Sequence, residues 1–223
     1  TARAGHHFYD TTSATAARGD AGDHHDVAGL VSRLKSGTQE KREYAAANVW
    51  KFASRRHESA EALVHAGAVR PLAELLACSS SNAQTRASGA LATMIHGAAT
   101  EEAAAATRAE PGGKSVLAEL ERQLASHQGL VKALIGIVRS GCADAQKEAS
   151  AVLAGLSEFH RFRLGIAEAG GVHPLVLLLK KGKASTQAHA ACVLANLSTS
   201  GNEDCQRAVV RTPEDGHGCV QAL

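Results

Sequence analysis

Aromatic residues are scarce in this sequence, since Phe, Trp and Tyr together make up 3% of 223 residues. Ala, Leu and Val carry most of the 44% apolar fraction instead, and the β-branched and aromatic runs that strands prefer are missing. This composition argues against a sheet protein and suits helices that pack closely through small side chains. A chain of this length can bury a sizeable core, as one domain or as a short repeat array.

An excess of charge and a long apolar run are also lacking. The 24 Lys and Arg residues nearly balance the 22 Asp and Glu residues, for a formal net charge of +2. A nucleic-acid-binding surface normally needs an obvious cationic excess, so we expect no nucleic-acid partner. No apolar run approaches the about 18 residues that span a bilayer, so we expect no direct membrane span.

The cysteines form no pattern that predicts a metal or redox site. There are five, an odd number, widely spaced and without a C-x-x-C pair: Cys78, Cys142, Cys192, Cys205 and Cys219. We expect buried free thiols in a reducing compartment. The predicted location is therefore intracellular, in the cytoplasm or, after removal of a transit peptide, in an organelle. Because the chain begins at Thr1 without a Met, we expect a fragment or a processed product.

The chain repeats itself with a period of about 41 residues. HAGAVRPLAELL (65–76) matches EAGGVHPLVLLL (168–179), and AQTRASGALATM (83–94) matches TQAHAACVLANL (186–197). A third copy consists of GLVKALIGIV (129–138) and AQKEASAVLAGL (145–156), and a fourth of LVSRL (30–34) and REYAAANVWKF (42–52). An Ala/Glu-rich stretch interrupts the register between the second and third units along the chain. Such self-similarity is typical of repeat architectures.

Each unit reads as three helices. The first ends at a glycine suited to cap it, Gly67 or Gly170, and the second starts near Pro71 or Pro174, since proline is tolerated in a first turn. The third helix opens at Gln84, Gln146 or Gln187. Apolar residues recur at helical spacing, with the third-helix core positions at Val49, Phe52, Leu91, Met94, Leu153, Leu156, Leu194 and Leu197. No single unit can bury both of its faces, so the units must stack.

The segments EAGGVHPLVLLL and TQAHAACVLANLS resemble the repeat signature of the armadillo family. The resemblance covers roughly residues 27–223, with an insertion at 98–114 as the main departure. It implies an all-α fold, a right-handed α-solenoid of three-helix repeats. It also implies a protein that holds other proteins, although armadillo proteins serve adhesion, nuclear import, ubiquitin ligation and scaffolding alike.

The resulting organisation is a flexible N-terminal tail at 1–25 and an array at 26–223. The repeats lie at about 26–57, 58–97, 115–158 and 159–200, with a partial repeat at 201–223 and the insertion at about 98–114. In the tail, His6-His7 and His24-His25 could hold a metal, but no rigid helix sets a ligand geometry, so we predict no metal site.

Within the insertion, residues 100–109 are predicted to extend a helix, and Glu110-Pro111-Gly112-Gly113 breaks it. Ser115 is a predicted N-cap for the next helix. Gly113-Lys114-Ser115 lacks both the first glycine and the preceding strand of a phosphate-binding loop. We therefore expect no nucleotide and no other cofactor.

Third helices line the concave groove of armadillo proteins, where extended peptides lie. In the importin-alpha branch a Trp and an Asn, four residues apart on each third helix, form a ladder that grips the peptide. Here the Trp position holds Ala47, Gly89, Ala151 and Cys192, and the Asn position holds Lys51, Thr93, Gly155 and Asn196. Only Asn196 matches, which disfavours a nuclear import adaptor.

The candidate groove is instead small and mixed in charge, because Glu43 and Glu148 accompany its lysines and arginine. Its predicted binding residues are Tyr44, Lys51, Arg86, Thr93, Lys147, Ala151, His189, Cys192 and Asn196. The partner could be an extended peptide, a helix or a neighbouring subunit. The convex side or the insertion stays open as an alternative binding surface.

The last residues, GCVQAL (218–223), match GLVKAL (129–134), and the chain stops inside a second helix. We expect Val220 and Leu223 to form an interface with further repeats or with another chain. The predicted function is a non-catalytic protein-interaction scaffold or a structural subunit of an assembly. The alternatives are a substrate-recognition arm of an E3 ubiquitin ligase and, less favoured, a nuclear import adaptor. No catalytic triad, Cys/His pair or carboxylate pair is suggested by the spacing, so we predict that it is not an enzyme.

Overall fold

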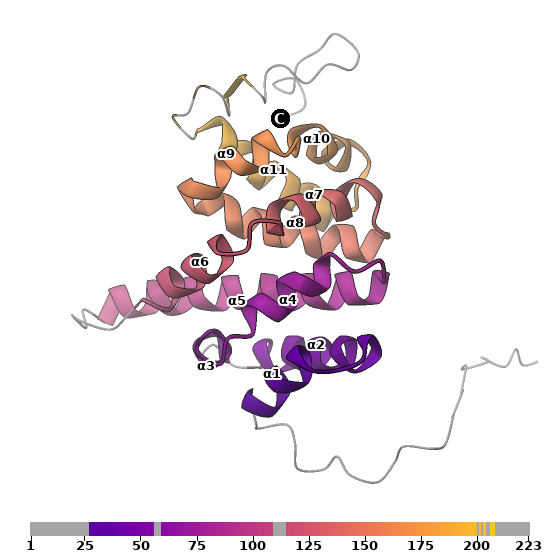
Figure 1. Cartoon of the computed structure of the whole chain (residues 1–223). Helices are drawn as coiled ribbons and strands as arrows, with labels where there is room; N and C mark the ends of the chain where they lie inside the picture. The colour runs from indigo at the N-terminus through magenta and orange to yellow at the C-terminus, as the bar shows by residue number, and fades with distance from the viewer. Residues whose placement is uncertain are drawn as a thin grey trace, which may run out of the picture.

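The computed structural model describes residues 27–55, 59–108 and 115–199, together with 201, 203, 206 and 207. Every regular element in this part of the chain is a helix (Figure 1). The helices are α1 (Val27–Lys35), α2 (Gln39–Ala53), α3 (Ser59–His65), α4 (Val69–Leu76), α5 (Ser81–Arg108), α6 (Val116–Ala125), α7 (Leu130–Ser140), α8 (Ala143–Glu158), α9 (His160–Glu168), α10 (Val172–Lys181) and α11 (Ala184–Ser198).

The helices stack in three series that follow the repeats. The first helices are α3, α6 and α9, which form a column on the left of Figure 1. The second helices α1, α4, α7 and α10 contact one another in that order, and so do the third helices α2, α5, α8 and α11. The predicted all-α solenoid is therefore confirmed.

Glycine ends the first helix of a repeat, as predicted. Gly67 and Gly170 have φ angles of +76° and +72°, a left-handed conformation that costs glycine little. In each case the residue after the glycine donates its N–H back across the last turn, from Ala68 to the Leu63 carbonyl and from Gly171 to that of Ile166, both at 3.0 Å. This pattern is a Schellman cap, and it turns the chain sharply into the second helix.

The third helices begin three residues before the glutamines at which they were predicted to open, at Ser81, Ala143 and Ala184. Each of these glutamines is therefore the fourth residue of its helix, and it ties that helix to the one before it. The side-chain Nε2 of Gln146 donates to the Val138 carbonyl at 3.0 Å, and Gln187 Nε2 donates to the Leu179 carbonyl at 3.0 Å. In the first described repeat the Nε of Arg42 replaces the glutamine and donates to the Leu34 carbonyl at 2.9 Å. The last carbonyls of a helix lack partners in their own helix, so this side chain satisfies one of them.

The core runs through all the stacked units. The predicted stripe of third helices is buried, with Leu91, Met94, Leu153, Leu156, Leu194 and Leu197 all at 0% exposure. Phe52, by contrast, is only partly buried and packs against the edge of this core.

The predicted helical extension is confirmed, because α5 is 28 residues long and continues to Arg108. Its C-terminal part projects past the column of first helices in Figure 1. Ser115 is the predicted N-cap of α6: its Oγ accepts from the N–H of Ala118 at 3.0 Å and donates to Glu102 Oε2 at 2.7 Å. The start of α6 is thus bonded to the extended part of α5.

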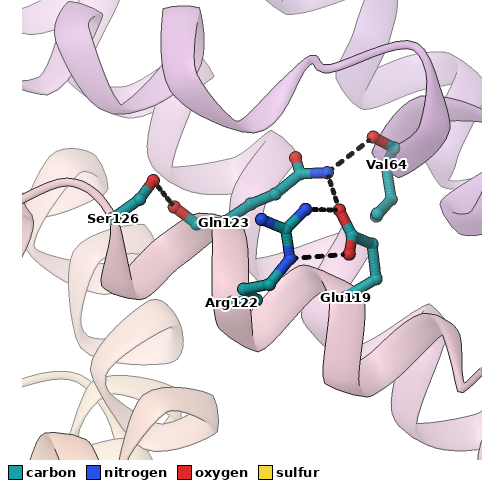
Figure 2. A network of polar contacts seen from close by, with 5 residues as sticks. All are labelled: Val64, Glu119, Arg122, Gln123 and Ser126. Carbon is teal, nitrogen blue, oxygen red and sulfur yellow. Dashed lines mark hydrogen bonds and ion pairs between the residues drawn. The ribbon is translucent and has the colours of Figure 1, made fainter.

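A polar network joins the first helices of neighbouring repeats (Figure 2). Gln123 Nε2 on α6 donates to the Val64 carbonyl on α3 at 3.1 Å and to Glu119 Oε1 at 2.7 Å. Arg122 donates to both oxygens of Glu119, at 2.9 and 2.5 Å. The hydrogen bonds from Arg122 and then Gln123 lower the pKa of Glu119 from 4.5 to about 2.

The prediction of buried thiols was wrong for two cysteines. Cys142 and Cys192 are exposed free thiols, and Cys78 is half-buried. Cys142 is exposed because it stands at the N-cap of α8, where its Sγ accepts from the Ala145 N–H and from Ser81 Oγ at 2.9 Å. Hydrogen bonding from Ser81 lowers the pKa of this thiol. Cys205 and Cys219 lie outside the described residues, as do the histidine pairs of the N-terminal segment.

Candidate functional site

A hollow of about 430 Å³, open to solvent, lies across three consecutive third helices, α5, α8 and α11. It contains four of the predicted groove residues: Thr93, Lys147, Ala151 and His189. Its full lining is Ala92, Thr93, Ile95, His96, Ala99, Lys147, Glu148, Ala151, Ala154, Gly155, Glu158 and His189. This size falls within the range of small ligand sites.

Two glycines of the third helices are required by packing, because side chains of the preceding third helix fill the space beside them. A Cβ at Gly89 would lie 2.5 Å from Trp50 Cε2, and a Cβ at Gly155 would lie 2.6 Å from Ile95 Cγ2. The Trp50 ring therefore packs on the neighbouring repeat. It does not belong to a row of Trp side chains that project from successive third helices to hold a peptide.

Polar side chains edge the hollow and are partly paired. Lys147 Nζ lies 3.0 Å from Glu148 Oε1, and the Glu148 side chain is only 12% exposed. The His189 ring on α11 contacts the preceding third helix, α8, through Nδ1, which lies 3.3 Å from Ser150 Oγ. With His96 and Glu158, the hollow offers two carboxylates, one ammonium group and two imidazoles.

The contact between Ser150 and His189 is not a catalytic dyad. Ser150 Oγ donates its proton to the Lys147 carbonyl at 2.7 Å, so it is directed away from the ring and the oxygen acts as an acceptor. A nucleophilic serine needs the reverse arrangement, with its proton aimed at the histidine base. In the part of the chain that the structure covers, no group of three or more His, Cys, Asp or Glu side chains could hold a metal ion.

Five predicted groove residues lie outside this hollow. Asn196 Nδ2 donates to Ser157 Oγ at 2.8 Å and so links α11 to α8. Tyr44, which is 52% exposed, lines a separate hollow between α1 and α2 of about 510 Å³. Lys51, Arg86 and Cys192 line neither hollow. The predicted end interface, Val220 and Leu223, lies outside the described residues.

Sequence reasoning missed His96 and Glu158 as lining residues. His96 follows Thr93 by one helical turn, and Glu158 follows Ala151 by two. Residues at these spacings share a helix face, so extending the predicted face along α5 and α8 would have found both.

Comparison with known proteins agrees with this architecture. Residues 166–199 match the profile of the Armadillo/beta-catenin-like repeat. The chain folds as a right-handed armadillo solenoid. A search of curated protein sequences finds no significant match.

Solved structures share the armadillo fold over most of the chain. An engineered protein is 23% identical, with a TM-score of 0.63 over 88% of this chain and 69% of its own. A computationally designed armadillo repeat protein for modular peptide recognition is 23% identical, with a TM-score of 0.63 over 82% of this chain and 68% of its own. A designed armadillo repeat protein in complex with the peptide (KR)4 is 21% identical, with a TM-score of 0.61 over 85% and 76%.

No single helix among the described residues is long and apolar enough to cross a bilayer, and α9 with α10 reach that length only across a 90° bend.

Proposed function

We propose that this armadillo solenoid is a non-catalytic protein-interaction scaffold that holds an extended segment of a partner protein in its third-helix groove. The observation that carries the proposal is the open hollow across α5, α8 and α11, whose lining includes the small residues Ala92, Ala99, Ala151 and Ala154. Small residues allow a peptide backbone to approach the helices, and the polar rim supplies hydrogen-bond partners for it.

Two proteins of similar fold bind or were designed to bind peptides, which supports peptide binding in this groove. One structural neighbour was designed for peptide recognition, and another holds the peptide (KR)4. The groove of this chain carries Glu148 and Glu158 but also Lys147, so we expect its partner segment to be mixed in charge. An intracellular location stays a prediction from the sequence.

The packing of the groove argues against a nuclear import adaptor. Trp50 lies over Gly89 of the next repeat, and the Asn196 side chain is bonded to Ser157. Neither side chain stands free to grip a peptide in the manner of a Trp/Asn ladder. A substrate-recognition arm of an E3 ubiquitin ligase would hold its partner in the same groove. It would differ from a general scaffold only in the domain that is joined to the repeat array.

The test is a selection of peptides from a random display library against the immobilised full chain, followed by titration calorimetry. Ala151→Arg places a long side chain in the hollow and should abolish binding of the selected peptides. Ala143→Arg, at an exposed position of the same helix outside the hollow, is the matched control and should leave binding unchanged. Recovery of peptides that bind both variants equally well would show that the partner site lies elsewhere.

A further inference from the structure

The outer surface of the second helices becomes cationic at α7 and α10. These helices contact each other, and neither contains an acidic residue. Positions on the outer side of α7 have equivalents one repeat later in α10. The equivalent pairs are Lys132 and His173, Gly136 and Leu177, Arg139 and Lys180, and Ser140 and Lys181. We refer to Lys132, Gly136, Arg139, Leu177, Lys180 and Lys181 as the α7–α10 face.

The four cations of this face are exposed, and none forms an ion pair within the described residues. The same surface of α4 is different, because Arg70 Nε there lies 3.2 Å from Glu74 Oε1. Cations in a last helical turn stabilise their own helix through its dipole, which accounts for Arg139, Lys180 and Lys181. It does not account for Lys132, the third residue of α7, where the dipole is unfavourable to a cation.

Like Lys132, Gly136 occupies a helix position where its residue type does not help the protein to fold. A glycine inside a helix is less stable there than alanine, and a Cβ at Gly136 would meet no atom within 4 Å. The described part of the protein therefore gives no packing reason for this glycine. At the corresponding position of α10 stands Leu177, one of two large hydrophobic side chains that are exposed in the described residues.

We propose that the α7–α10 face binds an acidic segment of a partner protein. Carboxylates of the segment lie opposite the four cations, its backbone approaches α7 at Gly136, and an apolar side chain covers Leu177. The site lies on the second helices and is separate from the groove, which the third helices line.

The exposed Leu177 and the open space at Gly136 favour an acidic protein segment over a nucleic acid or an anionic membrane as the ligand of this face. A phosphate backbone would use the cations but has no use for Leu177. An anionic membrane would attract the same charges, yet stable insertion needs more apolar surface than a single exposed leucine. A peptide that alternates Glu and Leu uses the cations, the leucine and the open space together.

The test is a fluorescence anisotropy titration of the full chain with a labelled synthetic peptide that alternates Glu and Leu. A peptide of equal length with Lys in place of Glu is the probe control. Binding should be specific for the acidic peptide and should weaken as salt is added. The double variant Lys180→Gln/Lys181→Gln should lower the affinity by about tenfold or more, whereas Lys35→Gln, at an exposed position in the last turn of α1, should not change it.

Gly136→Gln fills the open space without a clash and should also weaken binding. Gly165→Gln is its matched control, because Gly165 is a glycine within α9 whose Cβ would likewise meet no atom within 4 Å. Thermal melting confirms that each variant is folded. Equal binding of the lysine peptide, or unchanged affinity in the double variant and in Gly136→Gln, would overturn the proposal. It would also be overturned if the chain bound only phosphatidylserine vesicles or only single-stranded RNA.

Discussion

Leu153 and Leu194 are fully buried residues on α8 and α11, whereas Lys51 is exposed on α2. We expect Leu153→Ala or Leu194→Ala to lower the free energy of unfolding by about 2–5 kcal/mol, because the truncation leaves a cavity in a packed core. Lys51→Ala should change it by less than about 0.5 kcal/mol. Urea denaturation followed by circular dichroism measures both, and similar losses at the two kinds of position would mean that the helix faces are assigned wrongly.

The close packing of Trp50 on Gly89 predicts a loss of stability when side-chain volume is added, whereas the leucine variants lose stability because volume is removed. Gly89→Ala puts a Cβ 2.5 Å from the Trp50 ring, so we expect a loss of about 1–3 kcal/mol in spite of the higher helix propensity of alanine. Gly136→Ala is the control and should stabilise the chain by about 0.5–1 kcal/mol. A smaller loss for Gly89→Ala in a Trp50→Leu background would show that the ring is the cause.

Glu119 predicts a specific response to acid. Its pKa is lowered to about 2 in the folded state, so its carboxylate stabilises the fold above pH 4.5, and that contribution is lost as the pH falls toward 2. The urea midpoint of the wild type should therefore fall more steeply between pH 4.5 and 2 than that of Glu119→Gln. Parallel acid profiles for the two proteins would contradict the role assigned to the Arg122 and Gln123 hydrogen bonds.

Between elements, the hydrogen bond from Gln146 of α8 to the end of α7 can be tested. Gln146→Ala leaves the Val138 carbonyl at the end of α7 without its bond from Nε2, and we expect a loss of about 1 kcal/mol. Gln146→Glu should be worse, because a carboxylate cannot donate and is repelled by the C-terminal end of a helix. Gln128→Ala, at an exposed position of the α6–α7 turn, should have little effect on the same denaturation curve.

Over the whole molecule, the serial stacking of third helices predicts a gradient of stability. α5 and α8 each pack between two third helices, whereas α2 and α11 each have one such neighbour among the described helices. The stability of a repeat array depends on interfaces between neighbours, so we expect faster amide hydrogen exchange in α2 and α11 than in α5 and α8. Mass spectrometry of deuterium uptake measures this, and uniform protection along the chain would indicate a single cooperative unit instead.

Much of the fold could be predicted because it depends on local features. Helical spacing, the capping glycines Gly67 and Gly170 and the N-cap Ser115 act within a few residues of their own position. The repeat period then implied that the units stack, since no unit could bury both faces alone. The extension of α5 was also readable from its alanine and glutamate content, because these residues favour helix without any tertiary contact.

The sequence by itself therefore determined the helices, their order and the buried stripe, whereas the predicted binding role of the third-helix residues stays a prediction. Only the tertiary structure decided which of those groove residues meet. Equivalent residues recur about every 41 positions, yet Ser150 contacts His189 and Ser157 contacts Asn196, each pair 39 residues apart. This shift arises from the way neighbouring helices pack side by side, and a repeat period carries no information about it. For that reason Asn196, a predicted groove residue, is engaged by Ser157, and the Trp50 ring covers Gly89 of the next repeat.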